Sequence, residues 1–457
     1  MSNANSRRDF LKTAAATSAA ASAAYWSQEM ARAQDSKAKP TVASIGVGGS
    51  RGRYNRGGAI ARNAAKFGEM IAVCDVDDLH TAEFDEAMGG GLKKYRDYRD
   101  LLSETKPDVV TIGTPDHWHV PIAIAAMRAG SDVYCEKPLT LTIDEGRQIC
   151  DVVKETGRVF QVGTQQRSEN SSRFLRAIAI VQSGRLGDNV NAYVAIGGAP
   201  SCDPIEPAEA PADLDWDMWV GPAMQADYSE RRRKEFRWFY QYSGGKMTDW
   251  GAHHIDIAQW ALGKQDTGPL KVRGKGKLPS IVPTGFDWPA FFAGEASLPP
   301  AFNTANTFNI ELEYEGGAIM SVNDKYVREG DNVNFGNGIL FEGDKGRIFV
   351  NRGKLEGRPI NEMTEADNKE IDALVAKLYN GKKPGNHMGN FFSCREDGEL
   401  PVSDVFTHHR TMTACHLCNI SLMLGRDLTW DPKTEKFAGD DQANKLLSRP
   451  SRPGFTA

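Results

Sequence analysis

The sequence predicts a protein of the α/β class whose first half is a doubly wound parallel sheet. From Thr41 onward, short apolar runs alternate with segments of helical composition, which is the order of parallel βαβ units. A glycine-rich turn, residues 46–52, follows the first apolar run. A later buried strand ends in Cys135-Glu136-Lys137-Pro138-Leu139, which places a charged pair at the sheet edge where such folds bind ligands.

Composition is that of a soluble globular chain. The 457 residues are 40% hydrophobic and 25% charged, enough for two or three domains. The formal net charge of -5 offers no basic field for nucleic acid. The seven cysteines form no disulfide framework. Cys415 and Cys418 make a lone CxxC, which we interpret as two helix positions facing a core, so no metal site is predicted.

The N-terminus has the pattern of an export signal. Arg7 and Arg8 lie in a twin-arginine motif, an Ala-rich run continues to Trp26, and residues 31–33 offer a small-x-small cleavage site. The run is too short and too polar for a membrane span. Residues 1–33 are therefore predicted to be a signal peptide that takes the protein to the periplasm through the twin-arginine machinery. The alternative, an Ala-rich helix, leaves the paired arginines unexplained.

The first predicted unit is a buried strand (41–45), the glycine-rich turn, a helix (58–66) and a second strand (70–74). Glycines let the backbone approach a pyrophosphate, and the helix N-terminus supplies free N–H groups. Asp75 follows the second strand, where an acidic residue can accept hydrogen bonds from ribose hydroxyls. The unit predicts a dinucleotide site; the alternative is a glycine-rich loop in another α/β protein.

The match to GxGxxG is incomplete. Gly46 and Gly48 fit, but Arg51 takes the place of the third glycine, Gly52 comes one residue later, and residues 53–56 resemble an extra loop. The charge of Asp75 would repel a 2′-phosphate, so NAD is favoured over NADP. The arginines of the loop leave NADP open. The expected cofactor contacts in this unit are Gly46, Gly48, Gly49, Ser50, Arg51, Gly52 and Asp75.

Two more units complete the predicted sheet. Their elements are a helix ending near 106, a strand at 107–113, a helix at 120–129, a strand at 131–134, a helix at 142–156 and a strand at 159–163. Thr142 and Glu145 form a capping-box pattern at the start of the last helix. Polar loops, residues 114–119 and 164–167, follow two of the strands at the ligand edge.

In the second half, residues 249–263 read as one helix that ends at Gly263. Asp249, His253 and Asp256 stand at i, i+4 and i+7, on one face. A carboxylate one turn from a histidine can orient it and raise its basicity. The alternative is a structural hydrogen bond, which is the commoner role of a helical histidine near an aspartate.

The remaining segments are predicted more coarsely. Residues 203–233 read as an insertion or lid, whose tryptophans could stack on sugars or pack in a core. Residues 308–314 and 338–343 alternate as half-buried strands, each followed by a hairpin turn. Helices are expected to open at 386–392 and to cover 410–424, and the tail, 431–457, is expected to wrap the surface.

Together these motifs resemble the Gfo/Idh/MocA oxidoreductases, a family that includes glucose–fructose oxidoreductase and inositol dehydrogenase. The resemblance rests on Ile45-Gly46-Val47-Gly48-Gly49, Thr114-Pro115-Asp116-His117-Trp118-His119 and Glu136-Lys137-Pro138. It implies a Rossmann domain (40–163) and an α/β domain with an open, mostly antiparallel sheet (164–430). It also implies a sugar or cyclitol substrate and a homo-oligomer.

The resemblance further assigns Lys137, Asp249 and His253 to act on the substrate hydroxyl during hydride transfer. His253, helped by Lys137, takes the proton, and which of the two is the main base stays open. The remaining expected cofactor contacts are Thr114, Pro115, His117, His119, Glu136, Lys137 and Gln165. The expected substrate contacts are Lys137, Arg167, Asp249, His253 and Asp256.

Export bears on mechanism, because no pool of free dinucleotide exists outside the cytoplasm. We therefore expect a non-dissociating cofactor that is reset in place, either by a second substrate or by redox-neutral chemistry. The second route would make the protein an NAD-dependent glycosidase. A non-catalytic exported sugar-binding protein is the alternative from another class.

Overall fold

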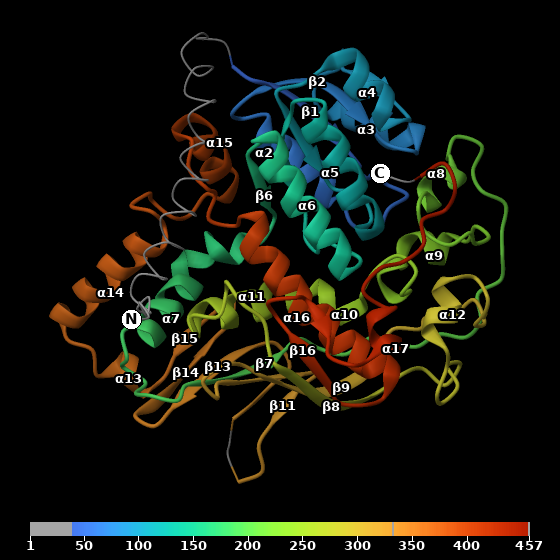
Figure 1. Cartoon of the computed structure of the whole chain (residues 1–457). Helices are drawn as coiled ribbons and strands as arrows, with labels where there is room; N and C mark the ends of the chain where they lie inside the picture. The colour runs from blue at the N-terminus through green and yellow to red at the C-terminus, as the bar shows by residue number, and fades with distance from the viewer. Residues whose placement is uncertain (1–38, 331–332, 456–457) are drawn as a thin grey trace, which may run out of the picture.

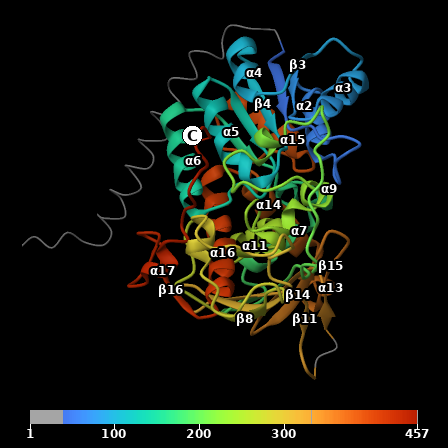
Figure 2. The ribbon, with the colours of Figure 1, turned by 90° about the vertical axis from the view of Figure 1, so that its right-hand side faces the viewer.

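The computed structural model describes residues 39–330 and 333–455. The predicted signal peptide, residues 1–33, lies outside the described residues. Figure 1 shows two layered halves, with the N-terminal sheet and its helices above and a broad second sheet below. The turned view in Figure 2 shows the same division.

The N-terminal sheet has six parallel strands in the order β3-β2-β1-β4-β5-β6. The strands are β1 (Thr41–Ile45), β2 (Glu69–Cys74), β3 (Lys93–Tyr95), β4 (Val109–Ile112), β5 (Asp132–Cys135) and β6 (Phe160–Val162). The central strands β4 and β5 are buried throughout, as expected where helices cover both faces. The order reverses between β1 and β4, which confirms the doubly wound sheet and puts a switch point beside the glycine-rich turn.

Its helices are α2 (Arg56–Ala64), α3 (Asp78–Ala87), α4 (Tyr98–Thr105), α5 (His119–Arg128) and α6 (Ile143–Thr156). The capping box of Thr142 and Glu145 is present at α6. Helix α3 and strand β3 were not predicted from the sequence. The reason is local: β3 is a three-residue edge strand with exposed Lys93 and Lys94, so it lacks the apolar run that marks a buried strand.

The C-terminal sheet has nine strands in the order β15-β14-β13-β7-β10-β9-β8-β16-β17, all antiparallel except for the β7–β10 pair. This confirms the open, mostly antiparallel sheet. The strands are β7 (Asn191–Ala195), β8 (Lys271–Lys277), β9 (Thr307–Glu313), β10 (Ile319–Asn323), β13 (Gly338–Gly343), β14 (Gly346–Val350), β15 (Leu355–Glu356), β16 (Leu428–Asp431) and β17 (Lys436–Phe437). A separate hairpin pairs β11 (Tyr326–Val327) with β12 (Asn334–Phe335).

Three helices, α7 (Arg173–Gln182), α11 (Gly251–Ala261) and α16 (Val405–Leu424), lie between this sheet and the N-terminal domain (Figure 1). Helix α16 contacts α6 on one side and α11 and β8 on the other, so it joins the two cores. The other helices are α8 (Trp216–Val220), α9 (Glu230–Lys234), α10 (Gly245–Asp249), α12 (Trp288–Phe292), α13 (Arg358–Asn361), α14 (Glu365–Leu378), α15 (His387–Asp397) and α17 (Asp441–Asn444). Short 3-10 turns cover Asp116–Trp118, Gln165–Arg167, Asn170–Ser172 and Phe236–Trp238.

Although α16 is long and buried, none of the helices within residues 39–330 and 333–455 combines the length and apolarity that crossing a membrane requires. In the same ranges, no group of three or more His, Cys, Asp or Glu side chains could hold a metal ion. Cys415 and Cys418 of α16 are fully buried in the C-terminal core, as the helix interpretation of this pair predicted.

Three expectations about the second half need correction. Residues 249–263 are not one helix, because α10 ends at Asp249 and α11 begins at Gly251. Strand β13 is buried over four consecutive residues rather than half-buried, since the β11–β12 hairpin contributes Tyr326 to a cluster on its outer face. The tail does not simply wrap the surface: β17 extends the sheet, and Leu446 and Leu447 are buried in the core.

The predicted insertion, residues 203–233, packs on the N-terminal domain. Trp216 stacks on Trp219 with ring centroids 4.5 Å apart, and the Trp118 indole N–H donates to the Met218 carbonyl at 3.0 Å. Trp219 is 5% exposed, so its main role is packing, although it also contributes to the wall of the cavity described below.

The fold buries several histidines in a neutral state. Burial lowers the pKa of His253 well below 6.5 and lowers the pKa of five others to about 4 or 3: His117, His254 and His387 (about 4), and His408 and His416 (about 3). In the unfolded chain a histidine has a pKa of about 6.5. Each group therefore stabilises the folded state fully above that pH, and this stability is lost as the pH falls below it.

We expect the free energy of unfolding to fall by about 1 to 2 kcal/mol per buried histidine between about pH 7.5 and 5. Burial also raises the pKa of three carboxyl groups, that of Glu145 to about 7 and those of Asp116 and Glu169 to a smaller extent. These shifts act in the opposite direction, but they are three groups against six. Denaturant titrations at pH values across this range check the expectation. An unfolding midpoint that does not change with pH would contradict it.

Candidate active site

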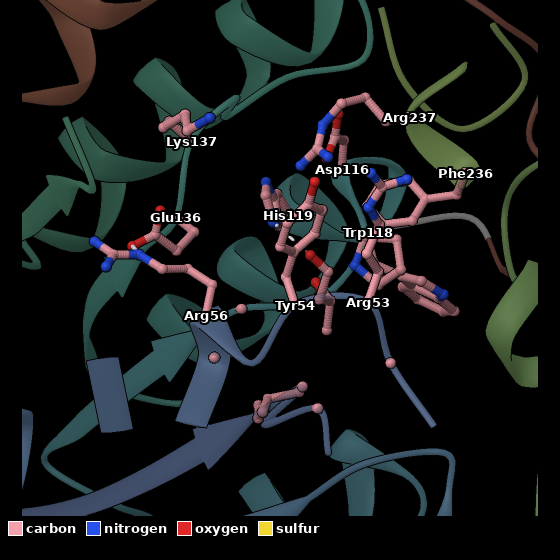
Figure 3. A pocket seen from close by; sticks show the side chains of 18 of the residues that line it. Arg53, Tyr54, Arg56, Asp116, Trp118, His119, Glu136, Lys137, Phe236 and Arg237 are labelled. Atoms are coloured by element: carbon pink, nitrogen blue, oxygen red, sulfur yellow. Dashed lines mark hydrogen bonds and ion pairs between the residues drawn. The ribbon is translucent and has the colours of Figure 1, made fainter. Parts of the chain in front are cut away.

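A cavity of about 610 Å³ lies where the carboxyl ends of β1, β2, β4 and β5 face the C-terminal domain. Figure 3 shows Glu136 and Lys137 on one side of it and Phe236 and Arg237 on the other, with His119 between them. Both halves of the chain therefore build this site.

The glycine-rich turn forms one end of the cavity. Gly46 and Gly48 have φ of +75° and +62°, a backbone conformation that favours glycine. A Cβ atom on Gly57 would lie 1.8 Å from the Gly46 carbonyl oxygen, so α2 packs directly on the turn through Gly57. This corrects the motif: residues 50–55 form a longer loop, and Gly57, not Gly52, takes the close-packing role of the third glycine.

The turn fits a dinucleotide pyrophosphate. Helix α2 has no capping side chain and no acidic residue in its first turn, so its positive potential is available to an anion, although the Gly58 N–H already donates to the Val47 carbonyl oxygen at 2.7 Å. Asp75 lines the same cavity and accepts hydrogen bonds from the Gly48 N–H at 3.0 Å and the Asp77 N–H at 3.1 Å. These bonds hold its carboxylate at the end of β2, where a ribose hydroxyl would meet it.

Lys137 and Asp249 meet in the wall of the cavity. The Lys137 Nζ donates to Asp249 Oδ1 at 2.6 Å and to the Asp249 carbonyl oxygen at 2.9 Å. Arg237 Nε lies 3.3 Å from Asp249 Oδ2. Burial alone would raise the pKa of Asp249, but the charges of Lys137 and Arg237 outweigh it and lower this pKa to about 2. Asp249 was expected to orient His253; in the structure it binds Lys137 instead.

His253 lies on α11, four residues after Asp249, and is 3% exposed. Its Nδ1 is enclosed without a hydrogen-bond partner among the described residues, which leaves Nε2 as the nitrogen open to a ligand. Burial, followed by the charge of Lys137, lowers the pKa of His253 well below 6.5. The imidazole is therefore neutral at neutral pH and can accept a proton.

Two further groups fix the walls near Lys137. The Glu136 Oε1 accepts from Arg56 Nε at 2.9 Å and from Gln165 Nε2 at 3.0 Å, which joins the start of α2 to the end of β5. The ring nitrogens of His119 lie 2.7 Å from the Pro138 carbonyl oxygen and 2.9 Å from that of Thr114. These contacts hold Glu136 and Pro138, the residues on either side of Lys137, in place.

Thr114 and Pro115 also line the cavity. Thr114 Oγ1 is buried without a hydrogen-bond partner among the described residues. A buried hydroxyl without a partner costs free energy, so a bound ligand that hydrogen-bonds it would relieve this cost.

Several residues predicted as cofactor contacts do not line the cavity: Gly49, Ser50, Arg51 and His117. The Ser50 N–H donates to Glu83 Oε2 at 2.8 Å, and Arg51 donates two hydrogen bonds to Asp213, at 2.6 and 2.9 Å. His117 Nε2 lies 3.0 Å from the Trp219 carbonyl oxygen. These residues hold the loop and the insertion in place, and their placement does not support direct cofactor contact.

Arg167 and Asp256 pair with each other instead of lining the cavity. Arg167 donates to both Asp256 oxygens, at 2.7 and 2.6 Å, and both side chains are almost fully buried. Thr411 of α16 donates to the same carboxylate at 3.0 Å. The pair ties α11 to its neighbours and so positions His253, but it does not support the predicted substrate contacts.

The structure also adds cavity residues that the sequence did not single out: Tyr54, Asp116, Arg237 and Arg352. Asp116 accepts from the Ser243 hydroxyl at 2.5 Å, and burial raises its pKa. The Arg237 guanidinium lies 5.0 Å from the Tyr54 ring centroid. The aromatic and basic composition of residues 236–242 was the available signal for Arg237.

The cavity lies at the switch point of the sheet and is lined by a glycine-rich turn and by an acidic residue after the second strand. A lysine, an aspartate and a histidine from the two domains also line it. This combination defines a dinucleotide-dependent oxidoreductase. Comparison with family models agrees. Residues 40–164 match an oxidoreductase family with an NAD-binding Rossmann fold, and residues 201–279 and 306–457 match the C-terminal α/β domain of the same family. The protein belongs to the Gfo/Idh/MocA oxidoreductases, enzymes of the sugar and cyclitol dehydrogenase type, and NAD is its cofactor.

Similar proteins include D-glucoside 3-dehydrogenase of Escherichia coli, 26% identical over 349 residues, which span 73% of this chain and 86% of that protein. A glycosyl hydrolase family 109 protein of Shewanella is 38% identical over 99 residues, 19% of this chain and 21% of that protein. Among solved structures, the WlbA dehydrogenase of Bordetella pertussis, in complex with NADH and UDP-GlcNAcA, has a TM-score of 0.59 at 16% identity, covering 87% of this chain and 99% of that one.

Proposed function

We propose that the protein oxidises a secondary alcohol carbon of a sugar or cyclitol by hydride transfer to NAD. One observation carries the proposal: Lys137, Asp249 and His253, which come from distant segments, line a single cavity with the Gly46–Gly48 turn. The similarity to D-glucoside 3-dehydrogenase, over most of both chains, supports a sugar substrate.

When bound, NAD supplies the hydride acceptor, C4 of its nicotinamide ring. His253 Nε2 accepts the hydroxyl proton of the substrate, and the carbon gives up its hydride as the C=O bond forms. The Lys137 amine donates a hydrogen bond to the same oxygen as negative charge develops on it. Asp249 holds that amine in place through its contact at 2.6 Å. The neutral state of His253 favours it over Lys137 as the base.

Replacing His253 with alanine is expected to lower kcat by about 100-fold, the lower end of the range for a general base, because the Lys137 amine can partly substitute. The wild-type rate should show no histidine-like inflection between about pH 6 and 7, since the pKa of His253 lies well below 6.5. Steady-state rates across this pH range check both points. A variant with the full wild-type rate would exclude His253 as the base.

Export by the twin-arginine route and a non-dissociating cofactor form a second part of the proposal. The twin-arginine pattern at residues 6–12 supports export, and export supports a bound cofactor, because no pool of free dinucleotide exists outside the cytoplasm. Native mass spectrometry of the mature protein should show one NAD or NADH per chain and a start after residue 33. A chain that retains residues 1–33 in the periplasmic fraction, or that purifies without dinucleotide, would contradict it.

The alternative function is a redox-neutral NAD-dependent glycosidase. The short match to glycosyl hydrolase family 109 proteins is the observation that favours it. One experiment distinguishes the dehydrogenase from the glycosidase. An aryl glycoside should release its aglycone only if the protein is a glycosidase, whereas a dehydrogenase should give reduced nicotinamide, followed by its absorbance, as sugars are added.

A further inference from the structure

Many of the side chains that line the cavity are cationic. Eight lysine and arginine side chains reach it: Arg53, Arg56, Arg96, Lys137, Arg233, Lys234, Arg237 and Arg352. Seven of them have a carboxylate oxygen within 4.0 Å. Within the described part of the chain, Arg352 is the one cation of the eight that has no such partner.

Arg352 is held in a defined orientation. It comes from the turn between β14 and β15, in the C-terminal domain, and its guanidinium lies 4.6 Å from the Trp250 ring centroid. With the Gln166 amide assigned so that its oxygen faces this side chain, Arg352 Nε donates to that oxygen at 3.1 Å. Stacking on an aromatic face and one Nε bond fix the guanidinium plane. The two terminal NH₂ groups then have no hydrogen-bond partner among the described residues, and the side chain is accessible to solvent.

Arg352 lies on the substrate side of the cavity. The Trp250 ring on which it stacks is 5.9 Å from the His253 ring, centroid to centroid, and the charge of Arg352 contributes to the lowered pKa of His253. The glycine-rich turn belongs to the other domain. Partial burial, followed by the charge of Arg56, lowers the pKa of Arg352, although the charges of Asp249 and Glu169 act in the opposite direction. Within the described residues, the terminal NH₂ groups of Arg352 remain free to bind an anion on this side of the cavity.

We propose that Arg352 determines specificity by binding a carboxylate on the substrate, so that the preferred substrate is an acidic sugar, such as a uronic or aldonic acid. This inference rests on the proposed dehydrogenase function. Two parallel N–H groups match the two oxygens of a carboxylate. The acid is favoured over a phosphorylated sugar because the charge of Glu169, which also lines the cavity, acts on Arg352, and this charge would repel a dianion more strongly than a monoanion.

The test compares kcat/KM for matched pairs, D-glucuronate with D-glucose and D-galacturonate with D-galactose. The wild-type protein should favour the acid of at least one pair by about 10-fold or more. In Arg352→Gln, kcat/KM for that acid should fall by about 10- to 100-fold, through KM, because a charge-assisted hydrogen-bond pair is lost. The value for the neutral sugar should fall much less, because a neutral sugar has no carboxylate for Arg352 to bind. Arg358→Gln is the matched control, since Arg358 pairs only with Glu362 on the surface.

Equal losses for the acidic and neutral sugar in Arg352→Gln would overturn the proposal and leave Arg352 a structural role. Preference for glucose 6-phosphate over glucuronate would overturn it in favour of a phosphate site. If no sugar reduces the bound dinucleotide, the proposed function fails, but the carboxylate site can still be tested. Saturable quenching of tryptophan fluorescence by glucuronate, lost in Arg352→Gln, would then support it, and no quenching in the wild-type protein would overturn it.

Discussion

Replacing Lys137 with methionine is expected to lower kcat by about 1,000-fold, the size of effect seen when a preorganised donor to a developing oxyanion is removed. Methionine fills much the same space but cannot donate to the substrate oxygen. The variant also leaves the Asp249 carboxylate, 2.6 Å from Nζ in the wild-type protein, with Arg237 as its remaining charged partner. Single-turnover rates of dinucleotide reduction measure the loss in the chemical step.

Bound NAD should stay at the wild-type ratio in this variant, because the glycine-rich turn and Asp75 are unchanged. Lys382→Met is the matched control. Lys382 is buried to a similar degree, 18% exposed against 15% for Lys137, and pairs with Asp397 outside the cavity. A Lys137→Met protein that turned over at the rate of the Lys382→Met protein would remove the lysine from the mechanism.

The features that sequence predicts well here are those set by local chemistry. The strand that ends at Cys135, the Lys137-Pro138 turn after it and the capping box at Thr142 all follow from neighbouring residues, and all are present. The pairing of Lys137 with Asp249 joins residues 112 positions apart. No periodicity encodes such a distance, so it was the family resemblance that placed both residues in the site.

The errors have a common physical origin. Helical spacing predicts that Asp249 lies one turn before His253 on the same helix, and this proximity suggests that the carboxylate orients the imidazole, but α10 ends at Asp249 and His253 belongs to α11. A buried ammonium attracts a carboxylate more strongly than a neutral ring does, so Lys137 takes Asp249 and His253 is left neutral. Arg167 and Asp256 show the same preference, because these two buried, oppositely charged side chains pair with each other and not with a ligand.

Replacing Gly57 with alanine is the second change for which we expect a large effect. The new Cβ would lie 1.8 Å from the Gly46 carbonyl oxygen and 3.1 Å from the Val47 Cα. Both are backbone atoms, so no side-chain rotation can relieve the clash, and α2 must move away from the turn. We expect bound dinucleotide to fall below about a tenth of the wild-type ratio and the free energy of unfolding to fall by about 3 kcal/mol, at the upper end for overpacking.

Gly52 provides the informative comparison, because it is the glycine that comes one residue after the third position of the GxGxxG pattern. A Cβ atom there would have its closest contact at 3.3 Å, to the Gly49 carbonyl oxygen, so Gly52→Ala should cost much less dinucleotide and stability. Gly336→Ala, with no atom within 4 Å of its added Cβ, serves as the neutral control. Dinucleotide released on denaturation, measured per chain, ranks the three variants. If Gly52→Ala lost more dinucleotide than Gly57→Ala, the close packing of α2 on the turn would not be what shapes this site.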